Sequence, residues 1–245
     1  MSGFWSATPG RLVFTEFGVL HWVVLAAVGL VIAGTVVFRK RLRGERVRRV
    51  VPLTVMIVAV VLEVAYHVWT GVHHLDFLFN LVPLELCAIS LWLSVALIVT
   101  HRRGVFEILY FTSIGGLAAI LFPAFGAYGP DHLRFWHYFV VHSYVLWIVA
   151  WFLAVEGYRL RRTALVRLLV VGLPFALVVW LIDRGFAVNY MYLAGPSATA
   201  SPLDFLGQPP WYFVKLLGLA VVIFGLMYVV APKEHRTPTV VPDPA

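Results

Sequence analysis

The stretch Phe79-Asn-Leu-Val-Pro-Leu-Glu-Leu-Cys-Ala-Ile-Ser90 lies inside a long apolar segment, yet it carries an amide, a carboxylate, a thiol and a proline. A carboxylate at bilayer depth is unfavourable by roughly 3 kcal/mol on insertion scales, so it usually faces a protein interior or a wet cavity. We therefore expect a functional site to be built against this stretch, which supplies Asn80, Glu85 and Cys87.

Composition places the chain among integral membrane proteins. Of its 245 residues, 61% are hydrophobic and 13% are charged, and the mean hydropathy is +0.89. Soluble domains average about 45–50% apolar and about 25% charged residues. Since about 20 apolar residues cross a bilayer as a helix, the chain has room for about seven spans.

The hydropathy pattern predicts an all-α fold, a polytopic membrane bundle of seven transmembrane helices. An external segment (residues 1–16) precedes the transmembrane domain (residues 17–231), and a polar tail (residues 232–245) that we expect to be disordered follows it. The predicted helices are residues 17–38, 50–70, 77–100, 105–125, 135–156, 163–182 and 211–231.

The basic residues indicate the orientation. The chain carries a formal net charge of +7, and its densest basic run is residues 39–49. Basic loops follow the first, third, fifth and seventh predicted helices, whereas the other loops hold few positive charges. Cytoplasmic loops are enriched in Lys and Arg, so we predict an external N-terminus and a cytoplasmic C-terminus. This topology explains the charge, and no nucleic-acid partner is expected.

The long loop at residues 183–210 is predicted to be an external cap. It contains Asn189-Tyr-Met-Tyr192 and Asp204-Phe-Leu-Gly207, and Trp211 follows it directly. Loops longer than about 12–15 residues are usually functional or disordered, and the aromatic composition argues against disorder. The alternative is an interfacial aromatic belt.

Polar residues inside the predicted spans gather in their outer halves, and the inner halves are almost purely apolar. Glu63 and His67 lie four residues apart and therefore share one helix face. His137 and His142 begin the fifth predicted helix. With the Glu85 stretch, these residues predict a polar chamber near the outer surface.

The candidate residues fall into two groups. Imidazoles can act as bases and carboxylates can orient them, and a thiol can act as a nucleophile, although cysteine also occurs as a small buried hydrophobe. Buried polar pairs can also simply hold helices together, so both roles stay open. The catalytic candidates are His142, Cys87, Glu85, Glu63 and His67, and the substrate-binding candidates are Asn80, His137, Asn189, Tyr190, Asp204 and Trp211.

Four sequence features resemble the YwaF-like family of bacterial integral membrane proteins. They are Leu81-Val-Pro-Leu-Glu-Leu-Cys87, His142, Asn189-Tyr-Met-Tyr192 and Leu203-Asp-Phe-Leu-Gly-Gln-Pro-Pro-Trp-Tyr212. The resemblance implies a multi-pass protein of the bacterial plasma membrane, distantly similar to a eukaryotic acyltransferase of ether phospholipids. The family motif reads Pro-x-His-x-Cys, whereas this chain has Glu85 at the histidine position.

Three classes of function remain open from the sequence. The first is a membrane enzyme, a lipid acyltransferase or a related transferase or hydrolase. The second is a proton-coupled transporter, and the third is a non-catalytic subunit or assembly factor. We expect membrane lipids and a lipid or acyl substrate as partners, and no cofactor. A metal site is a further possibility, because several histidines lie on or near the outer side, but their spacings match no zinc motif and no metal ligand is assigned. The oligomeric state stays open.

Overall fold

The computed structural model of the chain describes residues 3–75, 82–196 and 202–234, and these are helical throughout apart from turns and isolated bridges. Six helical segments are long and apolar enough to cross a membrane, with α5 and α6 together forming one of them. The helices are α1 (Val19–Val37), α2 (Glu45–Val72), α4 (Leu86–Thr100), α5 (Arg103–Thr112), α6 (Ile114–Leu121), α7 (Leu133–Ala154), α8 (Ala164–Phe186) and α9 (Trp211–Val230), with short 3-10 turns η1 (Arg41–Arg43), η2 (Tyr190–Tyr192) and η3 (Pro202–Leu206).

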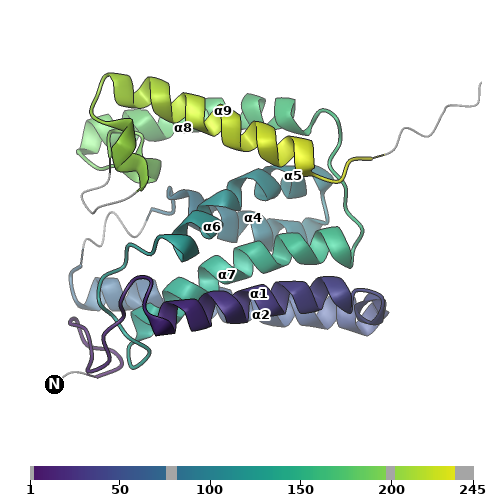
Figure 1. Cartoon of the computed structure of the whole chain (residues 1–245), viewed down its shortest axis with the longest axis horizontal. Helices are drawn as coiled ribbons and strands as arrows, with labels where there is room; N and C mark the ends of the chain where they lie inside the picture. The colour runs from purple at the N-terminus through teal and green to yellow at the C-terminus, as the bar shows by residue number, and fades with distance from the viewer. Residues whose placement is uncertain (1–2, 76–81, 197–201, 235–245) are drawn as a thin grey trace, which may run out of the picture.

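Helix α7 is the centre of the bundle. It packs against α1, α2, α4, α5 and α6, and its side chains Val145, Ile148, Trp151 and Phe152 are almost fully buried. Figure 1 shows α8 and α9 along the opposite side of the molecule from α1 and α2. Helix α5 connects the two sides, because it packs on both α7 and α8.

The bundle has two chemically different ends. The capped end, on the left in Figure 1, carries the N-terminal segment (residues 3–18) and the loop between α8 and α9. The basic end, on the right, carries the connections after α1, α4 and α7.

The third predicted helix begins later than the sequence pattern indicated. We predicted residues 77–100, but residues 82–85 are not helical and α4 begins at Leu86. Pro83 disfavours a helical conformation in the residue before it and cannot donate a helical hydrogen bond. Glu85 is consequently the N-cap residue of α4, with extended φ and ψ of −66° and 142°.

The fourth predicted helix is divided. We predicted one helix over residues 105–125, whereas Ser113 separates α5 from α6 and the helix ends at Leu121. The Ser113 hydroxyl donates to the Tyr110 carbonyl at 2.7 Å, and Gly115 and Gly116 follow, which are poor helix formers. A Cβ on Gly116 would lie 3.1 Å from the His142 carbonyl oxygen. The absence of a side chain at Gly116 therefore lets α6 lie close to α7.

Candidate functional site

A buried carboxylate joins two histidines between α2 and α7, towards the capped end. The Glu63 carboxylate accepts a hydrogen bond from His137 Nε2 at 2.8 Å, and its other oxygen lies 3.3 Å from His67 Nε2. The Glu63 side chain is only 8% exposed. The pairing of Glu63 with His67 was expected from their spacing, and the structure adds His137, 74 residues further along the chain.

His67 has a nitrogen that is available for chemistry. Its Nε2 faces Glu63, and its Nδ1 is buried without a hydrogen-bond partner in the part of the chain that the structure describes. A carboxylate that accepts from one ring nitrogen fixes the tautomer and leaves the other nitrogen as an acceptor. Since buried polar atoms normally have a partner, this nitrogen fits a bound water or a reacting group.

His137 is held more tightly than His67. Its ring stacks on Tyr66, with centroids 4.0 Å apart and planes inclined by 6°. The Arg134 guanidinium lies 5.8 Å from the centroid of the same Tyr66 ring. These contacts fix His137 in the protein interior and make it a support for Glu63.

His142 and Cys87 lie on the other side of the same region. His142 Nδ1 donates to the Tyr138 carbonyl at 2.5 Å within α7, which leaves Nε2 as the unprotonated nitrogen of the neutral ring. Cys87, one residue into α4, is half-buried and close enough to Glu63 and Glu85 for electrostatic interaction with both carboxylates. The start of α4 therefore borders the Glu63 cluster.

Glu85 connects α4 to the loop between α8 and α9. Its carboxylate accepts a hydrogen bond from the Met191 amide at 3.1 Å. The adjacent Tyr190 amide donates to Asp183 at 2.9 Å, and Tyr190 itself is 3% exposed. Two carboxylates from different helices thus hold η2, whose Met191 has the left-handed φ of 53°.

Of the other predicted substrate-binding residues, one bonds its own loop, two are exposed and one is not described. The Asn189 amide is used within its own loop, where it donates to the Gly195 carbonyl at 3.1 Å and accepts from the Ala194 amide at 2.9 Å. Asp204 and Trp211 are exposed. Asn80 lies outside the described residues.

The N-terminal segment covers the capped end, which the sequence did not predict. The Trp69 indole and the His132 ring bond the Ser6 carbonyl, each at 2.8 Å. Asp131 accepts from the backbone amides of Leu12 and Arg11 at 3.1 and 2.6 Å, and these bonds lower the pKa of the Asp131 carboxyl group. The chain before α1 is therefore part of the folded structure.

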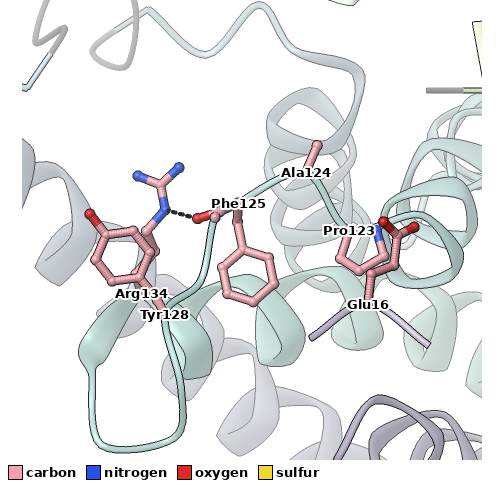
Figure 2. Close-up of a pocket in the computed structure, with 7 residues that line it drawn as sticks. Glu16, Pro123, Ala124, Phe125, Tyr128 and Arg134 are labelled. Atoms are coloured by element: carbon pink, nitrogen blue, oxygen red, sulfur yellow. Dashed lines mark hydrogen bonds between the residues drawn. The ribbon is translucent and has the colours of Figure 1, made fainter. Parts of the chain in front are cut away.

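A pocket of about 430 Å³ lies between this segment and the α6–α7 connection. Figure 2 shows Glu16 on one side and Arg134 on the other, with Arg134 Nε donating to the Phe125 carbonyl at 3.0 Å. Because Arg134 also lies over Tyr66, the pocket adjoins the residues that position His137. Its own lining does not include Glu63, His67 or His137.

The basic end contains a buried carboxylate that corrects the expectation of purely apolar inner halves. Glu107 of α5 is fully buried and binds Arg161 through a pair of hydrogen bonds, at 2.8 and 3.0 Å. Arg167 Nε lies 2.9 Å from the same carboxylate. These contacts raise the pKa of Arg161 above its ordinary value. A glutamate in an apolar helix was the available sequence signal.

The sequence model of the TMEM164 family matches residues 16–228. No curated protein and no solved structure matches the chain. Among the described residues, no group of three or more His, Cys, Asp or Glu side chains has the arrangement of a metal site.

Proposed function

The chain belongs to the TMEM164 family, a family of membrane proteins, and we propose that it is an enzyme that transfers or hydrolyses lipid acyl groups at the capped end of its bundle. The observation that carries this proposal is the unpartnered, buried Nδ1 of His67 on a ring whose other nitrogen faces Glu63. An imidazole oriented by a carboxylate is the arrangement that general-base catalysis of acyl transfer uses.

The proposed step moves one proton and exchanges one ester bond. His67 Nδ1 takes the proton from the attacking hydroxyl group of an acceptor lipid or of water. The oxygen forms a bond to the acyl carbonyl carbon, and the bond from that carbon to the leaving alkoxide breaks. The imidazolium, stabilised by Glu63, returns the proton to the leaving oxygen. In a second route, His67 or His142 takes the proton of the Cys87 thiol, and the sulfur forms a bond to the acyl carbonyl carbon while the ester bond breaks and the proton passes to the leaving alkoxide. The hydroxyl group of the acceptor lipid or of water then attacks the thioester, the carbon–sulfur bond breaks, and the base returns the proton to the thiol.

The surroundings of the cluster support a lipid substrate. Cys87 and Glu85 stand at the start of α4, where the Met191 amide of η2 bonds Glu85, and α4 packs against both α2 and α7, the helices that carry the Glu63 cluster. We propose that α4, with residues before it, is a seventh span. We also propose that the capped end is external and that the C-terminus is cytoplasmic in a bacterial plasma membrane. We further propose that the chain is related to the YwaF-like proteins and, more distantly, to an ether-phospholipid acyltransferase.

The test is acyl exchange by the purified full chain in lipid nanodiscs. Isotopically labelled phospholipid and an unlabelled lysophospholipid are supplied, and products are measured by mass spectrometry. We expect a labelled acyl group on the lysophospholipid or as free fatty acid, and loss of this product in His67→Ala and Glu63→Gln. Glu107→Gln is the matched control, because it removes the charge of the other buried carboxylate that bridges two bases.

The same variants distinguish the direct route from the thioester route, and they distinguish an enzyme from a transporter. Loss of product in Cys87→Ala, together with an acyl adduct on Cys87 in the wild type, selects the thioester route. Full activity in His67→Ala and His142→Ala removes the proposed base. If the wild type yields no product but takes up a solute along a proton gradient that Glu63→Gln abolishes, the chain is a transporter. A reporter fused to the C-terminus tests the orientation.

A further inference from the structure

A second pocket lies at the basic end, far from the Glu63 cluster along the bundle. It has a volume of about 280 Å³ and lies between the first turns of α2 and the last turns of α4 and α7. Its polar lining consists of Arg48 and Arg49 from α2, His101 at the end of α4, and Glu156 after α7. The pocket is therefore built from three helices that the fold fixes relative to one another.

The two arginines of this pocket have different surroundings. Arg48 binds Glu156, with Arg48 Nε 3.0 Å from both carboxylate oxygens, so this pair carries no net charge. Arg49 forms no ion pair with any residue in the described ranges. The ordered Arg48–Glu156 pair forms one wall, and Arg49 leaves an uncompensated positive charge at the edge of the pocket.

The rest of the pocket is apolar and faces outwards from the bundle. Trp151 and Phe152 of α7 are each 1% exposed and line its inner side. Leu53 and Val99 lie on two different helices at its outer side and are 41% and 73% exposed. A ligand that fills this pocket has an anionic group next to Arg49 and a hydrocarbon part along Leu53 and Val99.

The position of the pocket favours a membrane phospholipid as its ligand. Residues 39–49 contain seven basic residues and a single acidic one, Glu45, so the surrounding surface attracts anionic headgroups. Basic pockets between transmembrane helices at the membrane surface bind anionic phospholipids. We propose that this pocket binds the phosphate headgroup of an anionic phospholipid, with an acyl chain along Leu53 and Val99. The site is independent of the proposed acyl chemistry at the capped end.

The experiment compares the binding of phosphatidylglycerol and phosphatidylcholine to the full chain in detergent, measured by native mass spectrometry. The variants are Arg49→Gln, which removes the charge at the pocket, and Arg46→Gln, which removes the same charge from the same exposed basic run outside it. A third variant, Val99→Trp, fills the apolar side at an exposed position. Inorganic phosphate serves as the competitor that lacks a hydrocarbon part.

We expect the wild type to prefer phosphatidylglycerol by about fivefold or more, the effect of one arginine near the headgroup. Arg49→Gln should abolish this preference, Arg46→Gln should change it less than twofold, and Val99→Trp should weaken binding of the lipid. Millimolar inorganic phosphate should not displace the lipid. The proposal is overturned if both arginine variants lose the preference equally, which indicates general surface attraction. Displacement by inorganic phosphate also overturns it, because the pocket then takes a free anion.

Discussion

Glu63 and Glu107 are both buried carboxylates that each face two basic side chains, but their partners differ in kind. Glu107 holds Arg161 and Arg167, and Glu63 holds His67 and His137. An arginine keeps its proton under all ordinary conditions, so the Glu107 cluster is a permanent ionic link between α5 and the start of α8. Histidine exchanges its proton near neutral pH. The Glu63 cluster, unlike the Glu107 cluster, therefore contains the side chains that general acid–base chemistry uses.

Each cluster has one buried nitrogen without a hydrogen-bond partner among the described residues, but the two nitrogens are placed differently. Arg167 Nε lies 2.9 Å from the Glu107 carboxylate, whereas His67 faces Glu63 with Nε2 and not with the unpartnered Nδ1. Glu107 accepts hydrogen bonds from the Arg161 backbone and side chain at 2.8–3.1 Å. At the Glu63 cluster, His67 Nδ1 is buried and has no partner among the residues described. A carboxylate that arginines hold by several hydrogen bonds links helices and stabilises the fold. An imidazole that faces a carboxylate with one nitrogen and has no partner on the other is typical of a catalytic or binding site. The following substitutions test this difference.

The largest effect is expected for Glu63→Gln on catalysis. A glutamine keeps hydrogen bonds to the histidines but cannot stabilise an imidazolium, so turnover in the acyl-exchange assay should fall about 10²–10⁴-fold, the usual contribution of general-base catalysis. The thermal unfolding of the variant in detergent should remain close to that of the wild type. Unchanged turnover in a folded Glu63→Gln protein would contradict the proposed role.

Glu107→Gln should act on stability instead. Removing one partner of a buried ion pair costs about 3–5 kcal/mol and removing an exposed one about 0–1 kcal/mol. Arg161 and Arg167 are 35% and 38% exposed, so we expect a loss of about 2–3 kcal/mol in the free energy of unfolding. Denaturant titration in detergent measures it. If Glu107→Gln is as stable as the wild type, the ion pairs of Glu107 with Arg161 and Arg167 do not stabilise the fold.

Glu85→Gln should loosen the loop over α4. A hydrogen bond to a charged acceptor contributes about 1 kcal/mol more than one to a neutral acceptor, so exchange of the Met191 amide proton should become roughly fivefold faster. The Ala194 amide, which bonds Asn189 and not Glu85, is the internal control. Equal acceleration at both amides would indicate general destabilisation of the loop.

The smallest effect is expected at Asp131, which holds the N-terminal segment. The Leu12 and Arg11 amides lower the pKa of its carboxyl group below 3.8. Its stabilising contribution is therefore fully present above pH 3.8 and is lost as the pH falls through the lowered value. Pepsin cleavage near residues 11–12 should increase over this acidic range in the wild type. Asp131→Asn should show no such pH dependence.

Features that depend on a short stretch of sequence were predicted better than contacts between distant segments. Seven spans were predicted from long apolar runs, and six helical segments of the described chain are long and apolar enough to cross a membrane. The third predicted span, residues 77–100, is represented by the shorter helix α4. The runs were informative because hydropathy acts on each segment alone. The interval of four residues predicted that Glu63 and His67 share a helix face, and the structure confirms that they are in contact. Pro83 lies in an apolar run that reads as one continuous helix, so the later start of α4 was missed.

Contacts between distant segments were not predicted. The Met191 amide lies 106 residues from Glu85 along the chain, and Arg161 lies 54 residues from Glu107. The substrate-binding role of Asn189 stays a prediction, and the structure adds that its amide also holds its own loop. The identity of a polar residue indicates that it needs a partner, but not which one.

The sequence by itself determined that the chain is a helical membrane protein that carries titratable residues inside its apolar segments. The tertiary structure decided that Glu63 meets His137 and that Glu107 meets Arg161. The reason is geometric. Hydropathy fixes how deep a residue lies in the membrane, whereas the rotation and register of packed helices fix which side chains face each other. Those two quantities depend on the packing of side chains from all the helices around α7.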